Sequence, residues 1–152
     1  MAGSSIDFRV LEETTSRCCK TTEECGTCDK MRCLVGFAWT VAKYGSEKGV
    51  TRVDGGLRLL PTKDLRTFYE NDLVEAIATT LHQCKNCFDN HEAECGVSLI
   101  RLSLEQALLG ETLEYHGSAL RYLLDLEQRH GRFGKLVKEA FERQKAAASA
   151  AS

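Results

Sequence analysis

Proline is almost absent from this sequence, and so are long apolar runs. Pro61 is the only proline among 152 residues, so little in the composition interrupts long helices. The most apolar stretch, residues 31–42, is broken by Arg32 and Thr40. It is too short to cross a bilayer, which needs about 20 consecutive apolar residues. We therefore expect a helical protein that does not span a membrane.

The sequence also lacks the motifs of common catalytic sites. It has no Walker loop, no G-x-G-x-x-G, no G-x-S-x-G and no H-E-x-x-H. Glu127 and His130 form one E-x-x-H spacing. A carboxylate-bridged di-iron bundle needs two such motifs, so we interpret this single one as a coincidence. Motifs therefore assign no enzyme activity.

No large excess of basic charge is present. The formal net charge is −2, and residues 64–114 carry ten acidic groups against three basic ones. Near the C-terminus Arg132, Lys135 and Lys138 recur every three residues, which is typical of a solvated helix face. Since phosphate contacts supply most of the affinity for nucleic acid, we expect no nucleic-acid partner. The acidic middle favours a basic protein partner instead. We expect the chain to bind such a partner in a larger enzyme complex or to form a homo-oligomer.

The first residues, 1–5, show neither the basic nor the apolar region of a signal peptide, so we expect a cytoplasmic location. In that reducing compartment clustered cysteines indicate metal or redox chemistry more often than disulfides. The length is that of one ordinary domain. We therefore predict a single cysteine-rich metal-binding domain over residues 1–145. Residues 146–152 are predicted to be a disordered tail, because no apolar face continues after Phe141.

The apolar pattern predicts a mostly α fold, a bundle of about four to five helices with a small β element near the N-terminal third. Ile6, Phe8 and Val10 alternate with polar residues, as in a half-buried strand. Residues 50–53 and 57–60 flank a glycine-rich link and predict a β-hairpin. Three- and four-residue apolar spacing predicts the helices. They comprise one through Trp39 that ends near Gly45, and others over about 62–81, 97–110, 113–131 and 133–141.

The strongest feature is a set of eight cysteines in two groups. The first group consists of Cys18, Cys19, Cys25, Cys28 and Cys33. Cys25-Gly26-Thr27-Cys28 is a C-x-x-C loop, which brings two thiolates to one ion. Cys33 is expected in the first turn of the next helix, where backbone N–H groups favour the thiolate. Either Cys18 or Cys19 would complete a set of four ligands.

The second group consists of Cys84, Cys87 and Cys95, with His91 between the last two. Steps of three and four residues would place all of them on one face of a helix. On an unbroken helix Cys84 and Cys95 would be about 16 Å apart, too far for one ion. Either the helix breaks near Asp89 and the cysteines converge, with His91 or a cysteine of the first group as fourth ligand, or they belong to separate sites.

Four thiolates suit either zinc or an iron–sulfur cluster, and the spacing is diagnostic of neither. Because there are enough thiols for a second cluster, our first hypothesis is an iron–sulfur protein. It would transfer electrons or sense redox state as an accessory or regulatory subunit. The alternative is a zinc-stabilised helical protein-interaction module without redox activity. A thiolate-dependent enzyme is the third hypothesis, and the prediction is that the chain is not an enzyme by itself.

Overall fold

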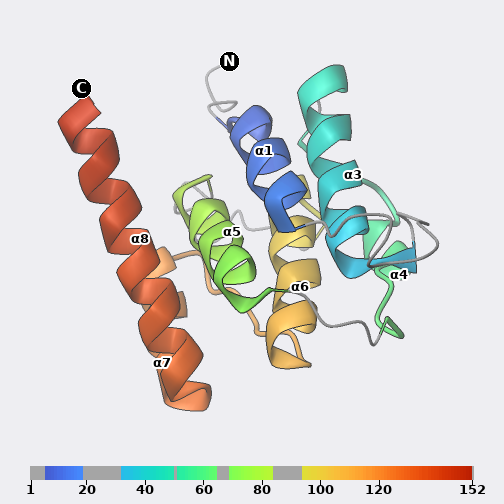
Figure 1. Cartoon of the computed structure of the whole chain (residues 1–152). Helices are drawn as coiled ribbons and strands as arrows, with labels where there is room; N and C mark the ends of the chain where they lie inside the picture. The colour runs from blue at the N-terminus through green and yellow to red at the C-terminus, as the bar shows by residue number, and fades with distance from the viewer. Residues whose placement is uncertain (1–5, 19–31, 50, 65–68, 84–93, 152) are drawn as a thin grey trace.

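The structure is a computed structural model that describes residues 6–18, 32–49, 51–64, 69–83 and 94–151 (Figure 1). The described residues form seven helices. These are α1 (Phe8–Cys18), α3 (Leu34–Lys48), α4 (Gly56–Leu59), α5 (Glu70–Gln83), α6 (Gly96–Leu109), α7 (Ala119–Arg129) and α8 (Gly131–Ala151). The predicted helical bundle is confirmed.

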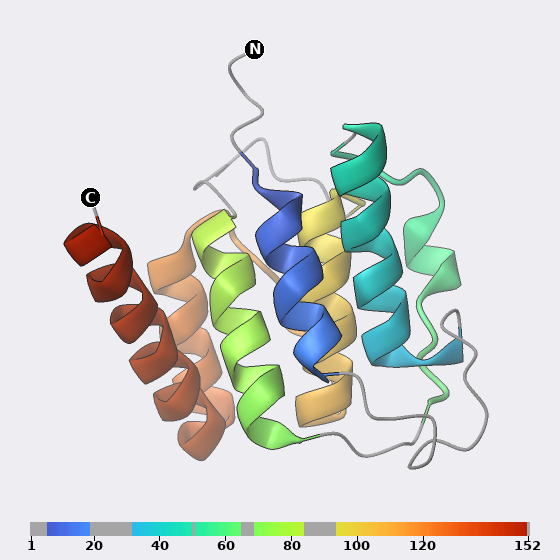
Figure 2. The same ribbon diagram turned by 45° about the horizontal axis from the view of Figure 1, so that its top comes forward.

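Four helices form the centre of the bundle. Helix α1 packs against α3 and α5, and α6 packs against the same two helices. Helices α3 and α5 run in one direction, whereas α1 and α6 run in the other (Figure 2). Helix α8 packs against α5 on one side and α7 on the other, so α7 and α8 form an outer layer.

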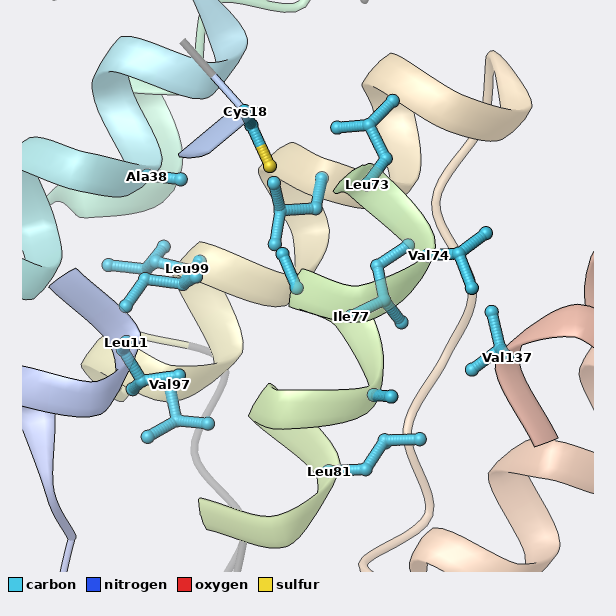
Figure 3. Close-up of a cluster of buried hydrophobic side chains, with 14 of the residues drawn as sticks. Leu11, Cys18, Ala38, Leu73, Val74, Ile77, Leu81, Val97, Leu99 and Val137 are labelled. Carbon is cyan, nitrogen blue, oxygen red and sulfur yellow. The ribbon is translucent and has the colours of Figure 1, made fainter. Parts of the chain in front are cut away.

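Helix α6 is the central element. Nearly every residue from Gly96 to Glu105 is buried, which is typical of a helix surrounded by others. The Ser103 hydroxyl donates a hydrogen bond to the Leu34 carbonyl oxygen at 2.5 Å and ties α6 to the start of α3. Leu99 and Val97 meet Leu11 of α1 and Ile77 of α5 in the apolar core (Figure 3). The core therefore lies where these helices meet.

The strand predicted at residues 6–10 is wrong, because α1 begins at Phe8. The Asp7 carboxylate accepts hydrogen bonds from the N–H groups of Arg9 at 3.0 Å and Val10 at 3.4 Å. A side chain that satisfies the first N–H groups favours a helix start. Phe8 and Leu11 are buried whereas Val10 is 38% exposed, so the burial follows a helical period. Alternation over only five residues did not distinguish the two periods.

The predicted β-hairpin is also wrong in the part of the chain that the structure describes. Its second arm forms the short helix α4, and Arg52 in its first arm makes an isolated antiparallel bridge with Cys95 instead. The Glu94 carboxylate accepts hydrogen bonds from the N–H groups of Gly55 at 3.1 Å and Leu57 at 3.3 Å. These donors are thereby satisfied by a distant residue. A two-stranded hairpin is marginal by itself, so such contacts override it.

Helix α3 ends at Lys48, three residues beyond the predicted end at Gly45. Gly49 closes it with a left-handed φ of 69°, which glycine adopts at little cost. Gly45 has a different role, because a Cβ there would lie 2.6 Å from Cγ of Phe8. It allows α1 to approach α3 closely.

The helix predicted from about residue 62 begins, in the described chain, at Glu70 as α5. A helix that began at residue 62 would have Asp64 in its first turn. Its Oδ2 instead accepts a hydrogen bond from the Leu34 N–H at 2.9 Å, at the start of α3. Asp64 therefore serves a helix thirty residues earlier in the chain, which a local pattern does not reveal.

Helix α8 continues through residues 146–151, for which the sequence predicted a disordered tail. The side chains of residues 145–150 are exposed. This segment is rich in alanine, which has the highest helix propensity. The helix therefore continues without a packing face.

Helices α5 and α8 are linked by Glu75. Its carboxylate lies 2.6 Å from Nη2 of Arg143 and accepts a hydrogen bond from Nε2 of Gln144 at 2.9 Å. The hydrogen bond from Arg143 is the main cause that lowers the pKa of Glu75, while partial burial opposes it and Gln144 adds to it.

We expect Glu75→Gln to lose a small, pH-dependent part of the stability. Because the folded pKa of Glu75 is lowered, the stabilisation is full above the ordinary value of 4.5 and is lost as the pH falls through the folded value. Urea unfolding curves at several pH values should show the wild-type advantage at pH 7 and none near pH 2. An advantage that persists at low pH would contradict this account.

Candidate metal centres

The Cys33 end of the bundle is the end where α1 finishes and α3 begins. Cys33 is the N-cap of α3, and its Sγ accepts a hydrogen bond from the N–H of Gly36 at 3.4 Å. The residue is 8% exposed. Backbone N–H groups at a helix N-terminus favour an anionic sulfur. This is the environment that the sequence predicted for Cys33.

Cys18 is the last residue of α1 and is fully buried. Its Sγ contacts two backbone carbonyl oxygens, that of Asp72 at 3.3 Å and that of Thr14 at 3.6 Å. Figure 3 shows the sulfur pointing into the cluster of buried apolar side chains that includes Leu73 of α5. Two carbonyl oxygens beside the sulfur are acceptors, which favour a thiol over the thiolate that a metal site requires.

The Cys95 end of the bundle is the opposite one. Cys95 is the N-cap of α6 and is half-buried, and its neighbour Gly96 donates its N–H to the Thr51 carbonyl at 2.7 Å. The last residue of α5, Gln83, also lies at this end, because its Oε1 accepts a hydrogen bond from the Asp7 N–H at 2.7 Å. The segment with Cys84 and Cys87 thus begins and ends here.

Among the described cysteines, Cys18 and Cys33 are separated from Cys95 by the length of the helices. Cys33 precedes α3, and Thr51, which binds Gly96, follows it. The 15 residues of α3 rise by about 22 Å. Helix α1 separates Cys18 from the same end of the bundle. A Cβ on Gly96 would lie 3.0 Å from the Phe8 ring, so α1 begins beside Gly96. Cys18 lies about 15 Å further along α1. One ion with sulfur bonds of about 2.3 Å cannot join Cys33 to Cys95.

Of the predicted ligands, the structure describes Cys18, Cys33 and Cys95. The other predicted ligands lie outside the described residues: Cys19, Cys25, Cys28, Cys84, Cys87 and His91. Within the described ranges, no group of three or more histidine, cysteine or acidic side chains is arranged to hold a metal ion.

Comparison with known proteins assigns this chain to no family. No protein-family model matches this chain, and neither the curated proteins nor the solved structures contain a match. None of the helices described is long and apolar enough to cross a membrane.

The E-x-x-H spacing does not form a site. His130 pairs with Glu111, at 2.5 Å between Nε2 and Oε2, rather than with Glu127. Arg129 contacts the same carboxylate at 2.9 Å. This cluster joins the end of α7 to the segment after α6, which is a structural role.

A buried ionic cluster on α6 was not predicted from the sequence. Arg101 is 2% exposed and Glu105, one turn later, is 0% exposed. Oε2 of Glu105 accepts hydrogen bonds from Nε of Arg101 at 3.1 Å and from the Tyr122 hydroxyl at 2.5 Å. The guanidinium also lies over the rings of Tyr115 at 4.7 Å and Tyr122 at 5.6 Å. The other residues of α6 are mostly apolar on all sides of the helix. That pattern could have indicated that Arg101 and Glu105 are buried and paired.

Glu105 also holds the chain that follows α6. Its Oε1 accepts the N–H of Leu113 at 2.9 Å. Burial raises the pKa of Glu105, and the three donors Arg101, Tyr122 and Leu113 oppose that rise. Burial also raises the pKa of Tyr122, which therefore stays a donor. The cluster fixes the position of α7 relative to α6.

Proposed function

We propose that this chain is a metal-stabilised protein-interaction module that holds two zinc ions, one at each end of the bundle. The observation that carries the proposal is that Cys33 and Cys95 lie at opposite ends of α3, a helix about 22 Å long. The sequence left open whether the two groups form one site or two. That separation supports two.

At the Cys33 end, Cys33 and three cysteines of the preceding segment supply the ligands. The three are Cys19, Cys25 and Cys28. The sulfur of Cys18 contacts two carbonyl oxygens in the core, and for that reason we leave it out of the set. Four thiolates are a ligand set of structural zinc sites.

At the Cys95 end, Cys84, Cys87 and Cys95 supply three thiolates, and His91 supplies the fourth donor. Three cysteines and one histidine are also a structural zinc set, whereas a common iron–sulfur cluster takes four thiolates. The thiols available at this end therefore favour zinc over a second cluster. Each ion would fix the segment between two helix ends, and the bundle would present its surface to a protein partner.

An iron–sulfur cluster at the Cys33 end is the second candidate. Four thiols remain at that end after Cys18 is left out, and four is the number that a cluster requires. Such a protein would transfer electrons or sense redox state. It would differ from the zinc protein in colour and in sulfide content.

Metal analysis of the full chain, purified without oxygen, separates these candidates. The proposal predicts about two zinc ions per chain, no acid-labile sulfide and no visible absorption. Iron with an equal amount of acid-labile sulfide and a broad visible absorption would favour the second candidate, an iron–sulfur cluster, over zinc. A folded protein without metal would contradict both.

Three serine variants test the assignment of ligands. Cys33→Ser and Cys95→Ser are each expected to reduce bound zinc to about half, because each removes a thiolate from a different site. Cys18→Ser is the matched control and should keep the full metal content, since its hydroxyl can still donate to the same carbonyls. Zinc per folded chain is measured by mass spectrometry of the metal. Loss of all zinc in either single variant would indicate one shared site and contradict the proposal.

A further inference from the structure

Helix α7 exposes two leucines that the fold does not use. Leu120 is 69% exposed and Leu124 is 56% exposed, although Leu123 and Leu126 of the same helix are buried against the bundle. Residues four apart share one face of a helix. The outer face of α7 therefore carries an apolar pair in contact with water.

These leucines border a groove between α7 and α8 of about 420 Å³. Leu123 of α7 and Phe141 of α8 complete its apolar lining. The two helices form the outer layer of the bundle (Figure 2). A groove of this kind accepts an amphipathic helix with apolar residues at positions i and i+4.

The charges around the groove select among such helices. Glu127 and Glu142 are acidic and Lys138 and Lys145 are basic, so the lining has no net charge. A strongly acidic or strongly basic helix would leave half of these groups opposite a like charge. The complementary helix carries both signs beside its apolar pair.

We propose that the groove binds α7 of a second copy of this chain, in a symmetric dimer. Helix α7 has the required leucine pair. Beside it stand Arg121 and Asp125, which carry opposite charges and lie 3.9 Å apart. In a twofold dimer the same surface serves both copies, so each Leu120 and Leu124 enters the groove of the other copy. The dimer is independent of the proposed zinc sites, because α7 and α8 contain no cysteine.

The contact is small. The groove has ten lining residues, whereas a stable interface uses about 20–30 residues on each side. The dimer is therefore weak, with a dissociation constant on the order of 10–100 μM.

Analytical ultracentrifugation of the full chain tests the proposal, with a reductant present to prevent disulfide-linked dimers. From about 2 to 500 μM the wild type should pass reversibly from monomer to dimer. Leu124→Glu should raise the dissociation constant at least about tenfold, because it places a charge in the apolar contact. A wild type that is monomeric throughout would overturn the proposal.

Leu59→Glu on α4 is the matched control, since Leu59 is 52% exposed and lies outside the groove. It should leave the dissociation constant unchanged. Circular dichroism should show both variants folded, as expected for exposed positions. Equal dimerisation of the two variants, or equal weakening, would also overturn the proposal.

Discussion

Replacement of Glu105 with leucine is expected to lower the free energy of unfolding by about 3–5 kcal/mol. The carboxylate is the buried partner of Arg101, and both side chains are almost completely excluded from solvent. Without Glu105 the guanidinium would remain buried and uncompensated. Nη1 of Arg101 already lacks a hydrogen-bond partner among the described residues, so little is available to replace the lost acceptor.

The loss extends beyond the ion pair. Tyr122 of α7 and the N–H of Leu113 would lose their acceptor at the same time. A buried donor that loses its partner costs about 1–3 kcal/mol. Because these donors belong to the segments after α6, the variant should also loosen the attachment of α7. Hydrogen exchange in residues 113–126 should therefore rise more than in α1.

Urea unfolding at pH 7 measures the effect, and a double variant separates its causes. Arg101→Met combined with Glu105→Leu removes both charges and fills a similar volume. Replacement of a whole buried ion pair by apolar residues is often neutral or stabilising, so the double variant should recover the part of the loss that comes from the buried guanidinium. The part that comes from the donors Tyr122 and Leu113 should remain, because their acceptor is still missing. A double variant no more stable than Glu105→Leu would show that the buried charge on Arg101 is not the cause.

The Arg101–Glu105 cluster also shows where the sequence stops being informative. An arginine and a glutamate four residues apart usually lie on an exposed helix face. Here the pair is buried, and it contacts Tyr115, Tyr122 and Leu113, which come later in the chain. Helix α6 itself was predicted well, as residues 97–110 against the observed Gly96–Leu109. Its apolar period ends at Gly110, which adopts a left-handed φ of 78°.

The β elements failed because their signals were short and local. The five alternating residues before Leu11 indicated a strand. The Asp7 carboxylate instead accepts hydrogen bonds from the first N–H groups of a helix, which stabilises the helix start. In place of the hairpin, the N–H of Gly55 donates a hydrogen bond to Glu94, a residue about forty positions away. Contacts between distant residues cannot be inferred from spacing along the chain.

The cysteine groups follow the same rule. Their spacing in the sequence indicates which thiols are close along the chain, and the structure describes only Cys18, Cys33 and Cys95 among them. The distance between Cys33 and Cys95 depends on the directions of α3 and α6, which the sequence did not predict. The burial of Cys18 depends on α5, through the carbonyl oxygen of Asp72.

A substitution at the close contact between α7 and α8 is also expected to destabilise the protein strongly. A Cβ on Gly134 would lie 2.4 Å from Cα and 2.6 Å from N of Glu127. These are backbone atoms, so α7 as a whole would have to move. We expect Gly134→Ala to destabilise the protein by about 2 kcal/mol, within the range for overpacking, despite the higher helix propensity of alanine.

Gly131→Ala is the matched control on the same helix. A Cβ on Gly131 has no heavy atom of the described chain within 4 Å. Alanine there gains helix propensity without a clash, so stability should stay the same or rise by up to about 1 kcal/mol. Thermal and urea unfolding of the two variants should therefore differ in sign. Equal effects would show that α7 and α8 do not meet closely at Gly134.

The same pair of variants connects the packing of α7 and α8 to the dimer. Gly134 lies opposite Glu127, and Glu127 lines the proposed groove. If α7 moves away from Gly134→Ala, the groove widens and fits the leucines of the second copy less well. We expect a dissociation constant several-fold higher for Gly134→Ala and unchanged for Gly131→Ala, measured by ultracentrifugation on folded protein. An unchanged constant in Gly134→Ala, together with the expected loss of stability, would place the dimer contact elsewhere on the surface.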